Sequence, residues 1–136
     1  MSKPVPQIRK YMTTTPITMG AEQTLATASA KMTEHRVRHL PVLKGGKLVG
    51  IISDRDVRLA ESFQGVDPKV EPLDFVMTND VYTVGPETPL DEVVGHMAET
   101  KVGSAIVVDA GHVVGVFTTT DACRALAELL ETRLRK

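Results

Sequence analysis

Residues 10–60 and 75–125 are two copies of one pattern, and this repeat limits the fold of the 136-residue chain more than any other feature. When the sequence is shifted by 65 positions against itself, 15 of the 51 aligned residues are identical and no gap is needed. Average composition would give about three or four identities over this length. The chain therefore encodes one structural unit twice. The identical pairs include Met12/Met77, Thr13/Thr78, Gly50/Gly115 and Asp56/Asp121.

Each copy has the element order strand, helix, two strands and helix. A short opening strand is expected at 17–19 and again at 82–84, and a helix follows each of them. In the second copy we expect Thr88 to cap this helix and Pro89 to lie in its first turn. Apolar residues from Leu90 onward recur at the spacing of one helical face, which indicates an amphipathic helix.

Two β-rich runs follow in each copy, and glycine-containing turns join them into hairpins. A second helix begins near Asp54 in the first copy and near Thr119 in the second. The expected runs and turns are 40–43 and 48–52 around Gly45 and Gly46, and 104–108 and 113–117 around Ala110 and Gly111.

One β-α-β-β-α copy of about 55 residues is too small to bury both faces of its sheet alone. We therefore expect one integrated α/β globule in which the copies pack about a pseudo-twofold axis. The first copy spans 7–63 and the second 73–131, with the last helix running to about 134. Residues 64–72 carry two prolines and no periodic pattern, so a linker is expected there.

Composition and charge exclude several classes of function. The 16 Lys and Arg residues nearly balance 17 Asp and Glu residues, for a formal net charge of −1. DNA is not an expected partner, because binding it requires the neutralisation of many phosphates. No apolar run is long enough to span a membrane, and the N-terminus lacks a secretory signal. With Cys123 as the single cysteine, no internal disulfide is expected, and we expect a cytoplasmic protein.

The most informative residues lie where each hairpin leads into the second helix. The first copy has Ser53 followed three positions later by Asp56, and the second has Thr118 followed by Asp121. This spacing is that of a capping box, which stabilises a helix by about 0.5–2 kcal/mol. It also suits ligand binding, because a helix N-terminus attracts anions and a nearby aspartate can accept hydrogen bonds from both hydroxyls of a ribose. Both interpretations stay open on the residues alone.

A basic cluster, residues 35–39, precedes the first hairpin, and Arg55 adds a cation beside the junction. The cluster is either a solvated turn or a phosphate-neutralising wall, and the second copy has only Lys101 in the corresponding place. The two sites should therefore differ in charge. The histidines form no clear ligand set, so no metal is expected. The phosphate-loop, dinucleotide and nucleophile-elbow motifs are absent from the sequence, so an enzyme is not expected.

From about residue 8 to 131, the chain resembles a tandem pair of CBS domains (cystathionine-β-synthase repeats), also called a Bateman module. Single pieces of the resemblance are unspecific, but the full ordered set occurs twice. Its features are Met12-Thr13, the strand 39–42 and the run 50–56 in the first copy, and Met77-Thr78, 103–109, Gly115, Thr118 and Asp121 in the second.

The resemblance implies two clefts between the repeats that bind adenosine-containing ligands. It implies that Asp56 and Asp121 hold ribose hydroxyls, and that Ser53 and Thr118 lie at the sugar–phosphate edge. The other implied ligand contacts are Arg55, Thr120, Arg36, Arg38 and His39 near phosphate, the main chain of Ile17, Thr18, Tyr82 and Thr83 near adenine, and Val37, Pro41, Val102 and Ile106 along the cleft walls.

The resemblance implies a regulatory module whose ligand is AMP, ADP or ATP, with S-adenosylmethionine and NAD ranked behind them. Such modules tend to form homodimers and to regulate an enzyme, channel or transporter. No effector domain accompanies the pair in this sequence, so the chain is either a stand-alone module that signals to a partner in trans or a fragment of a longer protein. Met1 favours the first, and we expect a stand-alone module. The alternative is a structural dimerisation module without a nucleotide ligand.

Overall fold

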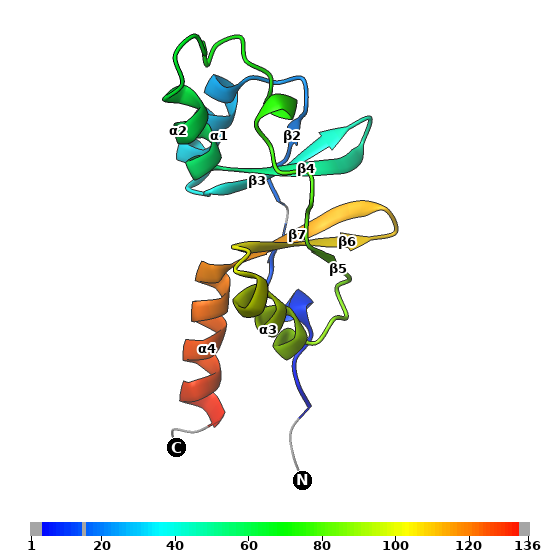
Figure 1. The fold of residues 1–136 in the computed structure, drawn as a ribbon. Coiled ribbons are helices and arrows are strands. Elements are labelled where there is room, and N and C mark those ends of the chain that lie inside the picture. Colours follow the sequence, from blue (N-terminus) through cyan, green and yellow to red (C-terminus); the bar gives the residue numbers. More distant parts are fainter. Residues whose placement is uncertain (1–3, 15, 134–136) are drawn as a thin grey trace. The chain divides into compact units, whose positions relative to one another are not determined.

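A computed structural model describes residues 4–14 and 16–133 and divides the chain into two compact units. The central unit comprises residues 16–81. The terminal unit combines the residues before position 16 with those from position 82 onward. Each unit contains a β-α-β-β-α repeat, so the expected mixed α/β class is confirmed (Figure 1). The predicted packing of the two repeats about a pseudo-twofold axis stays a prediction.

The central unit has a three-stranded sheet in the order β2-β3-β4, with β2 parallel to β3 and β3 antiparallel to β4. The crossover from β2 to β3 runs through α1, and α2 follows β4 directly. The elements are β2 (Met19–Gly20), α1 (Leu25–His35), β3 (His39–Lys44), β4 (Lys47–Ser53), α2 (Asp54–Glu61) and the 3-10 helix η2 (Leu73–Phe75).

The terminal unit repeats this plan with one added strand, in the sheet order β1-β7-β6-β5. Strand β5 is parallel to β6, and β1 and β6 both run antiparallel to β7. Its elements are the 3-10 helix η1 (Ile8–Lys10), β1 (Thr13–Thr14), β5 (Thr83–Val84), α3 (Leu90–Thr100), β6 (Ser104–Asp109), β7 (His112–Thr118) and α4 (Thr119–Arg133).

Each unit has its own apolar core between the helices and one face of the sheet. Alternation along the strands sends Leu40 and Val42 of β3 into the central core, and Ala105 and Val107 of β6 into the terminal core. The intervening strand residues therefore lie on the opposite sheet face.

The segment that precedes each repeat in the sequence packs on the other repeat. Thr13 of β1 pairs with Val116 of β7, and Thr78 pairs with Ile51 of β4 in the same way. The backbone N–H of Ile51 donates to Thr78 O at 2.9 Å, and Thr78 N–H donates back to Ile51 O at 2.9 Å. The compact units therefore do not coincide with the sequence repeats 7–63 and 73–131.

The stretch 64–72 does more than connect the repeats. Leu25 and Ala26, in the first turn of α1, donate their otherwise unpaired N–H groups to the carbonyls of Glu71 and Pro68, at 3.0 and 2.9 Å. The terminal unit repeats this arrangement, since Leu90 N–H of α3 donates to Pro6 O at 2.8 Å. Backbone carbonyls outside each helix therefore complete its N-terminus.

The predicted cap of α3 is wrong by one residue. Pro89 rather than Thr88 occupies the N-cap position, and no side chain caps the helix there. The backbone of Pro89 is extended, with φ −61° and ψ 140°. The pyrrolidine ring of proline fixes φ near this value. In the first repeat Thr24 fills this position and accepts a hydrogen bond from Thr27 N–H at 3.3 Å.

Candidate functional site

The predicted hydroxyl and aspartate residues lie at the two junctions between the second hairpin strand and the following helix. In the central unit, Ser53 ends β4 and Asp56 lies in the first turn of α2. Asp56 N–H donates to Ser53 Oγ at 3.1 Å, and Ser53 N–H donates to Asp56 Oδ2 at 3.0 Å. The capping box expected from the spacing is therefore confirmed at this junction.

The start of the hairpin brings part of the basic cluster to the same place. His39 is paired with Ser53 across β3 and β4, and Asp54 N–H donates to Arg38 O at 3.0 Å. The pKa of His39 lies below its usual value, mainly because the side chain is buried. The carboxylates of Asp54 and Asp56 raise this pKa, and the charge of Arg38 lowers it, but burial has the largest effect. The imidazole is thus a neutral donor and acceptor close to the carboxylates.

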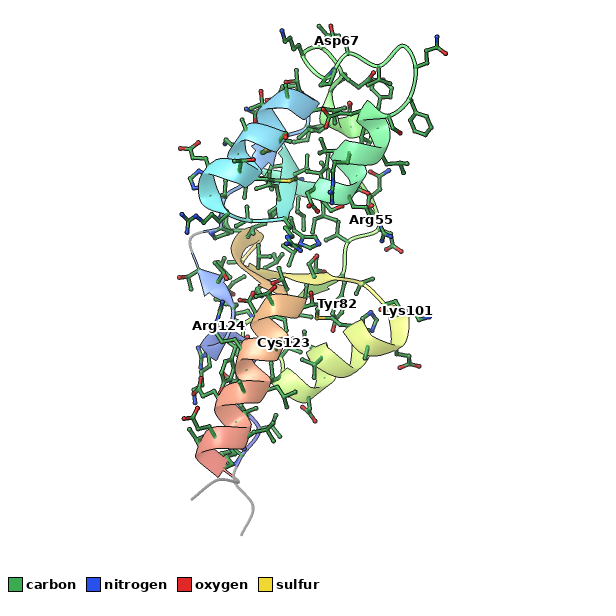
Figure 2. All side chains as sticks on the ribbon, turned by 90° about the vertical axis from the view of Figure 1, so that its left-hand side faces the viewer. Arg55, Asp67, Tyr82, Lys101, Cys123 and Arg124 are labelled. Atoms are coloured by element: carbon green, nitrogen blue, oxygen red, sulfur yellow. The ribbon has the colours of Figure 1, made fainter. Side chains whose placement is uncertain are left out.

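The remaining cations of the first junction are open to solvent. Arg55 extends from the first turn of α2 (Figure 2) and is exposed. Arg36 is also exposed and caps α1 in a left-handed conformation with φ 56°. The neighbouring Asp54 carboxylate is engaged by Arg58 at 3.3 Å. Arg55 and Arg36 are therefore free to orient toward an anion.

Asp56 lines a groove of about 320 Å³ within the central unit. The groove walls are mostly apolar and include Leu59, Phe63 and Phe75, with Glu71 as the second carboxylate. An apolar wall beside a hydrogen-bonding carboxylate matches the composition of a site for a small organic ligand. A larger hollow of about 570 Å³ beside α1 contains none of the predicted site residues.

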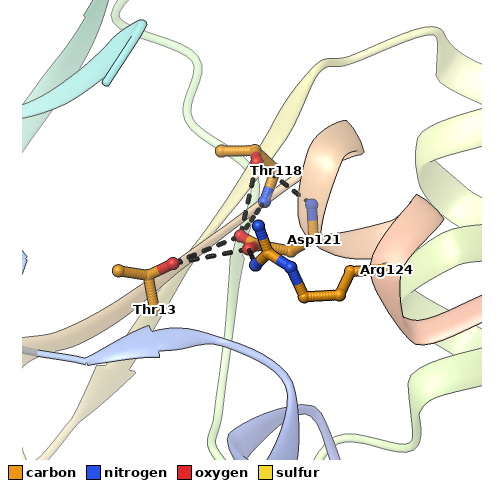
Figure 3. Close-up of polar contacts among 4 residues, drawn as sticks. All are labelled: Thr13, Thr118, Asp121 and Arg124. Carbon is orange, nitrogen blue, oxygen red and sulfur yellow. Dashed lines mark hydrogen bonds and ion pairs between the residues drawn. The ribbon is translucent and has the colours of Figure 1, made fainter. Parts of the chain in front are cut away.

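The junction of the terminal unit has the same box but a different carboxylate environment (Figure 3). Thr118 donates to Asp121 Oδ2 through its backbone N–H at 2.9 Å and its hydroxyl at 3.3 Å. Arg124 Nη1 donates to Asp121 Oδ1 at 3.1 Å, and the Thr13 hydroxyl lies 3.4 Å from Oδ1 and 3.5 Å from Oδ2. Asp121 is only 5% exposed, whereas Thr120 next to it is exposed.

The segments predicted to meet a base already use part of their polar surface. Lys31 Nζ donates to Thr18 O at 3.3 Å, next to Ile17, and Ile106 N–H donates to Tyr82 O at 2.9 Å. The Tyr82 ring stacks on His96 of α3, with the centroids 3.9 Å apart and an interplanar angle of 23°.

The surroundings of the Tyr82 phenol favour its neutral form. Burial, followed by the charge of Glu92, raises the pKa of Tyr82. The adjacent Thr83 opens β5 and is exposed. Of this segment, Thr83 therefore presents the most accessible polar groups.

The predicted wall residues fall into two groups. Val37 packs against the central core and Val102 against the terminal core, and both are half-buried. Pro41 and Ile106 are buried on the sheet faces opposite the helices, beside Ile51 and Val116 respectively. Within the central unit, Pro41 therefore shares a sheet face with His39 and Ser53.

Neither a metal site nor a membrane-spanning helix is found in the part of the chain that the structure describes. Among residues 4–14 and 16–133, no three His, Cys, Asp or Glu side chains are grouped to hold a metal ion. No helix within the same ranges is both long enough and apolar enough to cross a bilayer.

Comparison with known proteins identifies relatives over the whole repeat region. A family model described as CBS domain matches residues 8–62 and 73–128. The CBS domain-containing protein YhcV of Bacillus subtilis is 30% identical over 114 residues, which cover 84% of this chain and 81% of YhcV. Inosine-5'-monophosphate dehydrogenase of Korarchaeum cryptofilum is 34% identical over 122 residues, 89% of this chain but only 24% of that enzyme.

Solved structures agree with these matches. The protein designated AcuB from Vibrio cholerae is 30% identical, has a TM-score of 0.86 and is matched over 98% of both chains. The CBS domain pair of protein MJ0100 is 28% identical, with a TM-score of 0.83, over 92% of this chain and 98% of that one. That structure is a complex with 5'-methylthioadenosine and S-adenosyl-L-methionine.

Proposed function

This chain belongs to the CBS domain family and carries two copies of the domain, and from this premise we propose that it is a non-enzymatic regulatory module that binds an adenine nucleotide. AMP, ADP or ATP is the proposed ligand class, ahead of S-adenosylmethionine and NAD. The observation that supports it most is the first junction, where Asp56 leaves one carboxylate oxygen available beside an apolar groove and several cations. The complex of protein MJ0100 with two adenosine compounds supports the adenosine part of the ligand.

Each part of the ligand has a chemical counterpart at this junction. The Asp56 carboxylate would accept hydrogen bonds from the ribose diol, which are charge-assisted and worth roughly 1.5–3 kcal/mol each. The first turn of α2 presents backbone N–H groups and a positive helix end to phosphate, and Arg55 and Arg38 add charge. Binding would favour one state of the module, and a partner would respond to that difference in affinity.

A thermal-shift and calorimetry panel of AMP, ADP, ATP, S-adenosylmethionine and NAD tests this proposal. A ligand at a hundred times its dissociation constant should stabilise the fold by about 2.7 kcal/mol, which raises Tm by several degrees. Asp56→Asn should abolish the effect, while the matched control Asp54→Asn, which removes the same charge two positions earlier, should retain it. A panel without any shift or heat would refute nucleotide binding.

We also propose that the module forms a homodimer and signals to a separate effector protein. Helix α4 supports the dimer, because Leu126 and Leu130 are 58% and 46% exposed on it. Sedimentation should show a dimer that the pair of changes Leu126→Glu and Leu130→Glu converts to a monomer. If Leu59→Glu, at an equally exposed leucine of α2, dissociates the dimer and the α4 changes do not, α4 is not the interface.

The second candidate function is a structural dimerisation module without a ligand. It is favoured by one observation, that both aspartates cap their own helices. The absence of binding in the panel together with a dimer in sedimentation would select it.

A further inference from the structure

The carboxylate of Asp121 is saturated by donors from its own chain. A carboxylate offers about four acceptor positions. Four donor groups engage this one, the N–H and hydroxyl of Thr118, the hydroxyl of Thr13 and the guanidinium of Arg124. With 5% of its surface exposed, Asp121 has no free acceptor to offer a sugar hydroxyl.

The equivalent carboxylate in the central unit is open. Among the described residues, the Asp56 side chain accepts one hydrogen bond, from Ser53 N–H to Oδ2. One substitution and one contact that only the terminal unit makes account for the difference. Arg124 is replaced by Leu59 at the equivalent position, and Thr78, which stands where Thr13 does, makes no hydrogen bond to Asp56.

The contact between Thr13 and Asp121 joins residues 108 positions apart in the sequence. Thr13 belongs to β1, the strand that the N-terminal segment adds to the edge of β7. A two-residue edge strand gains little from its own pairing, so the contact of the Thr13 hydroxyl with the buried carboxylate, at 3.4–3.5 Å, adds to its attachment.

We propose that Asp121 is a structural lock that fastens β1 to the start of α4, and that the ribose-binding carboxylate of this chain is Asp56 alone. The second half of the statement rests on the proposed function, and the first half does not. The duplicated junctions have thus taken different roles: the second stabilises the fold, and the first is left to bind one adenosine ligand per chain.

Hydrogen–deuterium exchange on the ligand-free protein tests the lock. Asp121→Ala and the milder Thr13→Val should each speed amide exchange in 12–14 by about fivefold or more, the effect of losing one hydrogen bond. The matched variants Asp56→Ala and Thr78→Val should leave exchange in 77–79 unchanged. Equal effects in both pairs, or none at Thr13→Val and Asp121→Ala, would overturn the lock.

Calorimetric titration with AMP and ATP tests the single site. We expect one equivalent per chain, lost in Asp56→Ala. Two equivalents, with one lost in Asp121→Ala, would overturn the assignment of Asp56 as the sole ribose carboxylate. If neither nucleotide binds, the proposed function fails together with the single-site half, and the exchange experiment still decides whether Asp121 is a lock.

Discussion

His39 shows how one residue reports on the electrostatics of the first junction. It lies opposite Ser53 on β3, and burial lowers its pKa despite the carboxylates of Asp54 and Asp56. The folded chain therefore holds the His39 proton less tightly than the unfolded chain does, whose histidine pKa is about 6.5. The neutral imidazole is the form that the fold favours.

A loss of stability on acidification follows from this shift. As pH falls through about 6.5, the unfolded state takes up the proton first, so the free energy of unfolding decreases until the lower folded pKa is passed. We expect His39→Gln to flatten the dependence of Tm on pH between neutral and mildly acidic buffer. His112→Gln, which removes an exposed histidine of β7, serves as the control and should leave the slope as in the unaltered protein.

Gly50 and Gly115 are required because the segment that precedes the other repeat packs closely against each of them. A Cβ at Gly115 would lie 2.5 Å from Met12 Sδ, and one at Gly50 would lie 2.6 Å from Met77 Sδ and 2.9 Å from Thr78 O. We expect Gly50→Ala to reduce the free energy of unfolding by about 1–3 kcal/mol. Gly115→Ala should cost less, because the three atoms nearest to that Cβ all belong to the Met12 side chain, and Met side chains adapt.

Chemical denaturation measures both changes, and Gly95→Ala on α3 is a suitable control. A Cβ at Gly95 meets no atom within 4 Å, and alanine favours a helix more than glycine does. Gly95→Ala should therefore be neutral or stabilising. Equal stability of Gly50→Ala and the unaltered chain would show that the segment does not need this close approach.

At the residue scale, the sequence predicted local relations and missed distant ones. The boxes Ser53–Asp56 and Thr118–Asp121 are confirmed, because both partners of each box lie within one helical turn. Spacing alone is not sufficient, since Thr88 and Asp91 have the same spacing and form no cap at α3. The bond from Thr13 to Asp121 was not predictable, since it depends on which repeat the N-terminal segment contacts. The one available signal was the replacement of a leucine by Arg124, three positions after Asp121 on a helix.

At the element scale, the two hairpin turns differ in one instructive position. Gly45 and Gly46 have φ of 58° and 79°, and Ala110 and Gly111 have 51° and 80°. Both turns therefore need left-handed backbone at two residues, as type I′ turns do. Ala110 adopts a conformation that costs an L-residue about 1–2 kcal/mol relative to glycine.

Ala110→Gly should consequently stabilise the terminal unit by about 0.5–1 kcal/mol, after the greater flexibility of glycine in the unfolded chain is subtracted. The reverse change at the matched position, Gly45→Ala, should destabilise the central unit by a similar amount. Urea denaturation measures both. A destabilising Ala110→Gly would mean that the methyl group makes contacts worth more than the strain.

Element positions were predictable where they depend on local pattern. Both hairpins and the starts of α2 and α4 lie where alternation and turn residues put them. The helix N-termini were harder, because backbone carbonyls of Glu71 and Pro6, which belong to distant segments, accept the first N–H groups of α1 and α3. Such backbone partners leave no signature in side-chain composition, and for this reason 64–72 looked like a plain linker.

At the scale of the whole molecule, the segment that precedes each repeat packs on the other repeat. We call this arrangement the exchange of leading segments, and it determines which fragments can fold alone. Repeat alignment identifies equivalent residues but does not say which copy they contact, so the exchange was not predictable from the sequence. Residues 66–79 complete the central unit, through Leu73 in its core and Thr78 on the edge of β4. The N-terminal residues do the same for the terminal unit through Ile8 and β1.

Two fragments of equal length separate the units from the sequence repeats. Fragment 16–81 contains every element of the central unit, whereas fragment 1–66 replaces Leu73, Met77 and Thr78 with an N-terminal segment whose partners are in the other unit. We expect 16–81 to show dispersed amide resonances and cooperative, though weak, thermal unfolding, because chains of this size are marginal. Fragment 1–66 should lack both, since the α1 N-terminus and the β4 edge stay unpaired. Cooperative folding of 1–66 with an unfolded 16–81 would mean that each leading segment stabilises its own repeat, and the exchange would then not govern folding.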